Sequence, residues 1–361
     1  MKRLLAVFLA ALMVAAFSGC KGKDNSSSSS APVSLAVSSA EPQKTTLVNP
    51  LTGVEDMKKD AELLKPVAIM INNIETAWGV QASLSKADIV YETYVEGGIT
   101  RLMAVFKDLR TVGSNKIGSL RSGRYSYVDL AVGQGAQYVH AGLDEKYCGP
   151  HIAEVGTTTV DLNTTADRTN IKGGNSCATR ISNGLAYEHT LYTTGNELNK
   201  MLKDSVGLKL KKAQDNWMNF VAEDKKYTPA DGTCNELSVP FSGSYSAEFK
   251  FDSKTGVYNK YRYGEKQKDY NDGKAVSFGN VLVLYSNVYT FADGKHVQTD
   301  LSSGSGYYVS NGGYRKINWK KGSAASALKI TDDNGNDIEY NPGNTYVCFT
   351  NNSNKSSTVI K

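Results

Sequence analysis

The second half of the chain is divided into short strand-forming runs by turn dipeptides, and this pattern limits it to a sheet-rich fold. Runs such as 247–251, 256–263 and 279–289 are rich in Val, Tyr, Phe and Leu. They are too short for typical helices, and β-branched and aromatic residues favour strands. We therefore expect a mainly antiparallel, Tyr-rich β domain over residues 211–361. Dipeptides that favour tight turns separate the runs: Asp272-Gly273, Asp293-Gly294, Asn311-Gly312 and Asn334-Gly335.

The preceding part, residues 49–210, mixes strand and helix signals. An apolar run at 67–71 is bounded by proline and asparagine and predicts a buried strand. Two β-rich runs at 88–96 and 99–107 are joined by Gly97-Gly98, which predicts a hairpin. The expected fold class is α+β: an N-terminal layered α/β sandwich domain with a mixed sheet, then the antiparallel β domain. Further elements are expected as a helix over 124–132, a strand over 136–141 and a helix capped near Thr194.

The N-terminus reads as an export signal. Lys2 and Arg3 precede an uncharged apolar stretch that is shorter than the roughly 20 residues of a spanning helix. Small residues then lead to Cys20, and this arrangement resembles the lipobox of bacterial lipoproteins. The resemblance implies a signal peptide over residues 1–19, cleavage before Cys20 and lipidation of its thiol. A plain signal peptide with a chance cysteine is the alternative.

The segment over residues 20–48 predicts a tether between the lipid and the folded chain. It contains five consecutive serines and buries too little apolar surface to fold. We therefore expect a protein held by lipid on the extracytoplasmic face of the cell membrane. The formal net charge is +5 for the 361 residues, and a balance this mild without a clustered basic face does not predict nucleic-acid binding.

Four cysteines remain after Cys20, which is an even number. Outside the cytoplasm they could form two disulfides, and three connectivities are possible. We prefer a bridge between Cys148 and Cys177, because both lie in Gly-rich loop sequence of the first domain. Four unpaired thiols are the open alternative.

Several segments of both halves resemble the YerB-like bacterial lipoproteins, a two-domain family first defined as a domain of unknown function. The resemblance spans roughly residues 49–350 and implies an exported, membrane-anchored protein of Gram-positive-type bacteria. No established reaction comes with it, so it assigns no catalytic residue. The segments that carry it include KPVAIMINN, LSKADIVYETYVEGGITRLMAVF, IGSLRSGRYSYVDLA, NVLVLYSNVY and GSGYYVSNGGYRKINWKK.

Three carboxylates recur at every fourth residue of one run: Asp88, Glu92 and Glu96. In a strand with period two they would share a face, and Arg101 follows on the next predicted strand. A cross-strand pair of arginine and carboxylate is therefore predicted. Two interpretations stay open: a solvated face of a half-buried sheet, or a polar cleft that binds a charged ligand.

Arg121 and Arg124 stand just before a predicted helix. Backbone N–H groups at a helix start, together with two guanidinium groups, suit an anion such as phosphate, pyrophosphate or a carboxylated peptide. The alternative is packing of these arginines on carboxylates such as Asp129 or Glu96.

His140 ends a predicted strand beside a loop, a position where α/β sheets often bind ligands. A structural histidine is the alternative. The sequence contains no nucleophile elbow, Walker loop or zincin helix, and no compact metal-ligand spacing. We therefore expect neither a cofactor nor a metal.

Two functions follow from these expectations. The first is a non-enzymatic envelope lipoprotein that binds a cell-wall polymer or an envelope protein. The second is an envelope enzyme that acts on phosphate-linked cell-wall precursors through Arg101, Arg121, Arg124 and nearby carboxylates.

Overall fold

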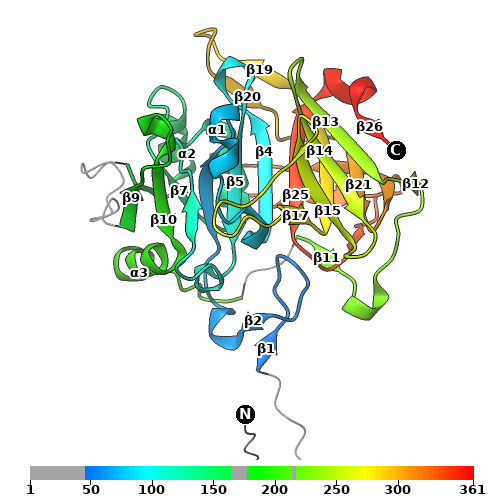
Figure 1. The fold of residues 1–361 in the computed structure, drawn as a ribbon, viewed down its shortest axis with the longest axis horizontal. Coiled ribbons are helices and arrows are strands. Elements are labelled where there is room, and N and C mark those ends of the chain that lie inside the picture. The colour runs from blue at the N-terminus through cyan, green and yellow to red at the C-terminus, as the bar shows by residue number, and fades with distance from the viewer. Residues whose placement is uncertain (1–44, 164–176, 214–216) are drawn as a thin grey trace, which may run out of the picture. The chain divides into compact units, whose positions relative to one another are not determined.

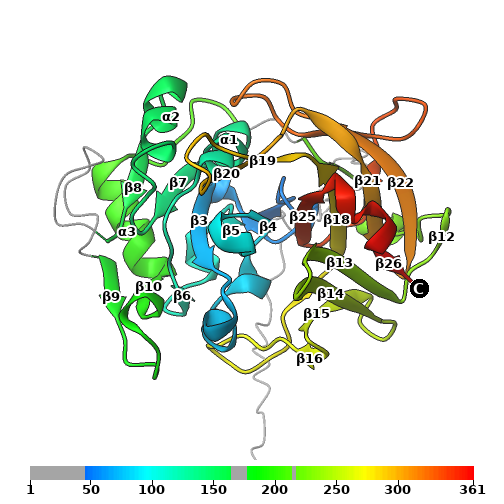
Figure 2. The same ribbon diagram turned by 90° about the horizontal axis from the view of Figure 1, so that it is seen from above.

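A mixed sheet of eleven strands passes through both halves of the described chain (Figures 1 and 2). The connection is made by β25 (Thr345–Asn351), which pairs in parallel with β4 (Ile89–Tyr94). The computed structural model describes residues 45–163, 177–213 and 217–361. The expected signal peptide, Cys20 and most of the tether lie outside these ranges.

The helices and strands are short. The α-helices are α1 Tyr125–Gly133, α2 Cys148–Val155 and α3 Gly195–Ser205. The strands of the first half are β1 Thr46–Leu47, β2 Met57–Lys58, β3 Val67–Asn72, β4 Ile89–Tyr94, β5 Thr100–Phe106, β6 Lys116–Gly118, β7 Gln137–His140, β8 Thr159–Asp161, β9 Ala178–Arg180 and β10 Leu191–Thr194. The strands of the second half are β11 Asn219–Phe220, β12 Gly232–Thr233, β13 Glu236–Ser242, β14 Tyr245–Asp252, β15 Val257–Arg262, β16 Glu265–Lys266, β17 Ser277–Phe278, β18 Asn280–Ser286, β19 Val288–Thr290, β20 Val297–Thr299, β21 Ser303–Ser310, β22 Gly313–Lys320, β23 Lys329–Thr331, β24 Glu339–Tyr340, β25 Thr345–Asn351 and β26 Val359–Ile360.

Two hydrophobic cores lie on opposite faces of the large sheet. Along β3, Ile69 and Ile71 belong to one core, and Ala68 and Met70 belong to the other. A six-stranded sheet and α3 cover the first face, and α1 and α2 cover the second (Figure 2). The large sheet has the order β12-β22-β21-β18-β25-β4-β5-β3-β7-β8, with β23 on β22, and the smaller has β16-β15-β14-β13-β26, with β17 on β15.

Local signals place the first-half elements where the sequence predicts them. β4 and β5 form the expected antiparallel hairpin, and Gly97 and Gly98 adopt φ angles of 73° and 70° in its turn. Side chains with a Cβ rarely adopt this conformation, so the turn favours glycine. Helix α3 begins after Thr194, whose hydroxyl accepts a hydrogen bond from the backbone N–H of Glu197.

The α+β fold class is confirmed, with a mixed sheet in the first half and mostly antiparallel strands in the second. The preferred disulfide is not formed. Cys148, the first residue of α2, packs in the core on the face that α1 and α2 cover, whereas Cys177 packs in the core on the other face of the sheet. The sheet separates the two sulfur atoms, and a disulfide needs Cα atoms within about 7 Å.

Candidate functional site

The polar candidates of the first half gather at one edge of the large sheet. β3, β7 and β8 run in parallel, and β4 has the same direction because β5 pairs antiparallel with both β3 and β4. Carboxyl ends of parallel strands form a common ligand-binding edge. His140 ends β7, Glu96 follows β4, and Arg101 is the second residue of the returning strand β5.

Arg124 and Glu96 form a paired ion contact at this edge. The Nε atom of Arg124 donates to both carboxylate oxygens of Glu96, at 2.7 and 2.9 Å. Arg124 stands directly before α1, so the helix start fixes its position. Burial raises the pKa of the Glu96 carboxyl, but the hydrogen bond and charge of Arg124 outweigh it and hold that pKa below its usual value.

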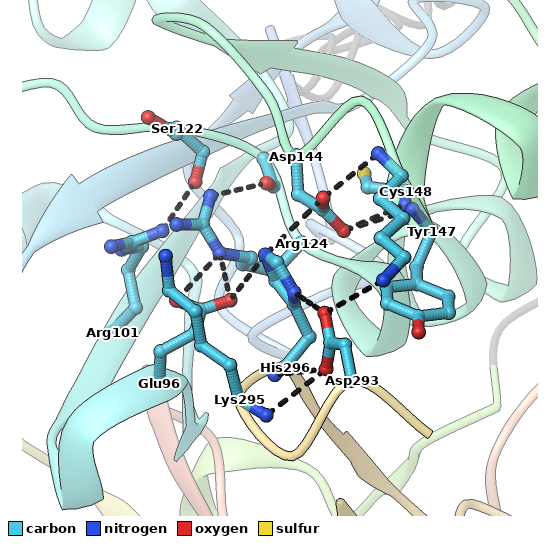
Figure 3. A network of polar contacts seen from close by, with 12 residues as sticks. Glu96, Arg101, Ser122, Arg124, Asp144, Tyr147, Cys148, Asp293, Lys295 and His296 are labelled. Atoms are coloured by element: carbon cyan, nitrogen blue, oxygen red, sulfur yellow. Dashed lines mark hydrogen bonds and ion pairs between the residues drawn. The ribbon is translucent and has the colours of Figure 1, made fainter. Parts of the chain in front are cut away.

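Arg101 brings a nearly buried positive charge to the same place. Its side chain is only 5% exposed, and its Nη1 atom donates to the carbonyl oxygen of Ser122 at 2.8 Å (Figure 3). Burial, together with the positive charge of Arg124, lowers the pKa of Arg101 to about 9. This guanidinium therefore stands in a site that is short of negative charge.

Arg121 adds a third guanidinium, which lies near enough to Arg101 and Arg124 to repel both electrostatically. Burial lowers its pKa, and its Nη1 atom donates at 3.5 Å to the carbonyl oxygen of Glu188. Among the described residues, Glu96 is the one carboxylate that forms an ion pair with any of the three. We call Arg101, Arg121 and Arg124 the arginine cluster.

A hairpin from the second half of the chain reaches this edge. The loop between β19 and β20 carries Asp293 and His296, which face Glu96 and Asp144 in Figure 3. The Nδ1 atom of His296 lies 2.6 Å from Asp293, and its Nε2 atom lies 3.3 Å from Asp144 and 3.8 Å from Glu96. The hairpin therefore links both halves of the chain at the candidate site. In the sequence, Asp293-Gly294 signals only a turn, so this role of the hairpin could not be predicted from it.

Aromatic stacking holds the hairpin in place. The ring of Phe291 stacks on Tyr147 with centroids 4.0 Å apart and meets Tyr125 edge-on at 5.4 Å. Each such pair contributes about 0.5–1.5 kcal/mol beyond simple burial.

We expect Phe291→Ala to lower the free energy of unfolding by about 1–3 kcal/mol, because both ring contacts are lost. Tyr289→Ala is the matched control on the same hairpin, since Tyr289 is 52% exposed, and its cost should stay within about 0.5 kcal/mol. Urea unfolding of the two variants measures the difference. Equal costs would mean that the stacking does not anchor the hairpin.

Two of the predicted carboxylates lie elsewhere, which corrects the expectation that all three share a face with Arg101. Arg101 pairs with Thr93 on β4, so the adjacent Glu92 points to the opposite face. There it is buried between the two sheets and accepts hydrogen bonds from Thr100 and Tyr245. β4 begins only at Ile89, and Asp88 stands before it, at the far end of the strand from Glu96.

His140 is at the expected edge but beneath the surface. It is fully buried, its Nε2 atom lies 2.9 Å from the hydroxyl of Thr159, and burial lowers its pKa. His140 therefore packs inside the protein against Thr159, and no hydrogen bond joins it to the arginine cluster among the described residues.

The described part of the chain holds no group of three or more His, Cys, Asp or Glu side chains arranged for a metal ion. None of its helices is both long and apolar enough to cross a membrane.

Comparisons with known proteins match both halves of the chain. Residues 51–209 match the family model described as "Protein of unknown function (DUF3048) N-terminal domain", and residues 237–347 match the model of its C-terminal domain. The protein named "Putative lipoprotein YerB" from Bacillus subtilis (strain 168) is 26% identical over an alignment of 315 residues, and this alignment covers 82% of this chain and 84% of that protein. The crystal structure of YerB from Bacillus subtilis has a TM-score of 0.70 at 24% identity and covers 87% of this chain and 99% of its own.

Proposed function

The chain belongs to the YerB-like family of two-domain proteins, and from this premise we propose that it is a lipid-anchored extracytoplasmic protein that binds an anionic envelope ligand at its arginine cluster. The ligand class is a phosphate-bearing cell-wall polymer or precursor. The supporting observation is an excess of positive charge: the three guanidinium groups of the arginine cluster lie together, and only Arg124 among them forms an ion pair with a carboxylate of the described residues.

The excess positive charge of the arginine cluster favours the binding of an anion. A buried guanidinium is costly unless it is paired, and Arg101 has only a carbonyl partner among the described residues. Phosphate groups suit arginine because two N–H groups can donate in parallel to two oxygens. An anion that contacts Arg101 and Arg121 would relieve their mutual repulsion and compete with Glu96 for Arg124.

Calorimetry with inorganic pyrophosphate tests this proposal on the purified full chain. We expect saturable binding that weakens as salt is raised, since the contact is electrostatic. The absence of measurable binding at low ionic strength and millimolar pyrophosphate would contradict it.

The anchor is the second part of the proposal. Relationship to a lipoprotein supports lipid attachment, and Cys20 is the residue in the lipobox position. Cys20→Ala should abolish labelling by a radioactive fatty acid and leave the signal peptide uncleaved. Lys21→Ala, one residue further on, should keep both the label and the processing. Labelling that survives in the Cys20 variant would contradict the assignment.

One observation favours an enzyme as the second candidate. His296 lies beside Glu96 and Asp144, next to the arginine cluster, and a histidine there could transfer protons during hydrolysis of a phosphate ester or anhydride. Release of orthophosphate from pyrophosphate in the presence of Mg²⁺ distinguishes the two candidates. Turnover that is lost in His296→Asn would favour the enzyme, and binding without turnover would favour the binding protein.

A further inference from the structure

We propose that the surface around β1, where the folded chain joins the predicted tether, docks on the anionic lipid headgroups of the membrane. This inference rests on the proposed lipid anchor and adds the face of the protein that meets the bilayer. We call this surface the lysine face. It is defined by four exposed lysines: Lys58, Lys59, Lys209 and Lys211.

Backbone pairing brings these lysines together from two distant segments. Lys58 lies on β2 opposite Thr46 of β1, and Lys59 begins the short helix that follows β2. Lys209 forms an antiparallel bridge with Leu64, and two backbone hydrogen bonds of 2.6 and 2.8 Å flank this bridge. Lysines from both segments therefore share the surface around β1.

The positive charge of the lysine face is not neutralised by its neighbours. Asp60 already pairs with Arg110 at 2.6 Å, whereas none of the four lysines forms an ion pair within the described residues. The other exposed carboxylates of the segment 45–65 are Asp56 and Glu62. The lysines therefore outnumber the remaining carboxylates, and a surface with this excess is attracted to anionic headgroups.

Two exposed apolar side chains accompany the lysines. Val48 follows β1 and is 56% exposed, and Leu63 stands beside the bridge to Lys209 and is 40% exposed. Such side chains can enter the boundary between headgroups and acyl chains while lysines stay among the headgroups. A soluble anionic polymer would use the charge but leave both apolar side chains in water. The combination therefore favours a lipid surface.

The attachment point of the chain also favours the membrane as the occupant. β1 is the first strand of the described chain, so its surface is the part of the folded unit that the anchor holds nearest to the lipid. About 25 residues join Cys20 to β1, and a flexible chain of this length has a root-mean-square span of about 25–30 Å. The lysine face therefore stays within reach of the bilayer.

Docking through the lysine face would turn the arginine cluster away from the bilayer. Asp88, directly before β4, accepts a hydrogen bond from Asn49 near β1 at 2.8 Å, whereas Glu96 follows β4 and pairs with Arg124. In Figure 1, β1 and β2 lie at the lower end and the hairpin of β19 and β20 lies at the upper end. A strand of six residues is about 20 Å long. The anion site would then be presented to the cell wall.

Vesicle sedimentation tests the lysine face without the lipid anchor. The protein is the chain from residue 20 with Cys20→Ala, and the vesicles contain phosphatidylcholine alone or in equal parts with phosphatidylglycerol. We expect binding to the anionic vesicles only, and this binding should weaken as salt is raised. Lys59→Gln combined with Lys209→Gln should weaken it at least tenfold, because each lysine near an anionic surface contributes about fivefold. Lys316→Gln combined with Lys355→Gln, at two exposed positions of the second half, should leave it unchanged.

Three outcomes would overturn the proposal. The first is equal binding to both kinds of vesicle, and the second is equal binding by the two double variants. The third is loss of vesicle binding in Arg101→Met, which would place the headgroups on the arginine cluster. Because the assay uses no lipid anchor, its failure is distinguishable from a failure of fatty-acid labelling at Cys20.

Tryptophan quenching on the lipidated protein gives a second measurement, which tests the orientation directly. In vesicles that contain brominated phosphatidylglycerol, Leu63→Trp should be quenched more strongly than the unaltered chain. Tyr289→Trp, at a 52% exposed position on the hairpin beside the arginine cluster, should show no added quenching. Equal added quenching in both variants, or none in either, would overturn the proposal.

Discussion

Arg101→Met is expected to weaken pyrophosphate binding by ten- to one-hundredfold. Arg101 supplies the most buried charge of the arginine cluster, and its Nη1 atom is fixed by Ser122. A hydrogen bond to a charged group contributes about 1.5–3 kcal/mol, and each 1.4 kcal/mol is a tenfold change in affinity. Calorimetry of the variant against the unaltered chain measures the loss.

Two further variants sharpen this expectation. Arg110→Met removes an arginine that pairs with Asp60 and Asp108 near the opposite end of β4, so its pyrophosphate affinity should stay unchanged. Glu96→Gln removes the carboxylate that competes for Arg124, so its affinity should rise several-fold. Equal affinities of the Arg101 and Arg110 variants would remove the basis for the proposed site.

Glu92→Ala is expected to lower the free energy of unfolding by about 3–5 kcal/mol, because several buried hydrogen-bond donors lose a shared acceptor and each such loss costs about 1–3 kcal/mol. Glu92 is fully buried, and its Oε1 atom accepts from the side chains of Asn73 at 2.7 Å, Thr100 at 2.6 Å and Tyr245 at 2.7 Å. The hydroxyl of Tyr346 donates to its Oε2 atom. Removing the carboxylate takes this acceptor away from the buried hydroxyls of Thr100, Tyr245 and Tyr346.

The buried cations nearby increase this cost. Lys260 and Arg262 extend from β15 into the same interior, and the Nζ atom of Lys260 has no hydrogen-bond partner within the described chain. The charge of Glu92 opposes the drop in pKa that burial imposes on Lys260. Without Glu92 this lysine loses the negative charge that acts on it most strongly.

The control for this prediction is Glu236→Ala, which removes an exposed carboxylate paired with Lys250. An exposed ion pair contributes about 0–1 kcal/mol. Urea unfolding of both variants at neutral pH measures the difference. A Glu92 variant within about 1 kcal/mol of the unaltered chain would mean that water or a rearranged side chain replaces the carboxylate.

Elements defined by local signals could be predicted from the sequence. The hairpin of β4 and β5 follows from Gly97-Gly98, and α3 follows from the cap at Thr194. The gathering of Arg121 and Arg124 beside α1 follows from their spacing before a helix start. In each of these cases, residues within a few positions of one another determine the conformation.

Features that depend on long-range pairing could not be predicted. The parallel pairing of β25 with β4 joins residues more than 250 positions apart, and it places Glu92 between two sheets. The register between β4 and β5 then directs Arg101 and Glu92 to opposite faces. A period of two along a single run does not contain this information, so Glu92 appeared to belong with Arg101.

The same limitation explains the disulfide. Cys148 and Cys177 lie in similar loop-like sequence, and only the path of the chain around the sheet places them in different cores. The hairpin that carries Asp293 and His296 is a further example, because its contacts with Asp144 and Tyr147 cross from one half of the chain to the other.

The most direct test of anion binding at the arginine cluster is a crystal structure of the protein soaked in tungstate, a phosphate-like anion with a strong anomalous signal. The account predicts an anomalous peak within hydrogen-bond distance of the guanidinium groups of Arg101 and Arg121. Tungstate bound at other basic surfaces, with this cluster empty, would contradict it.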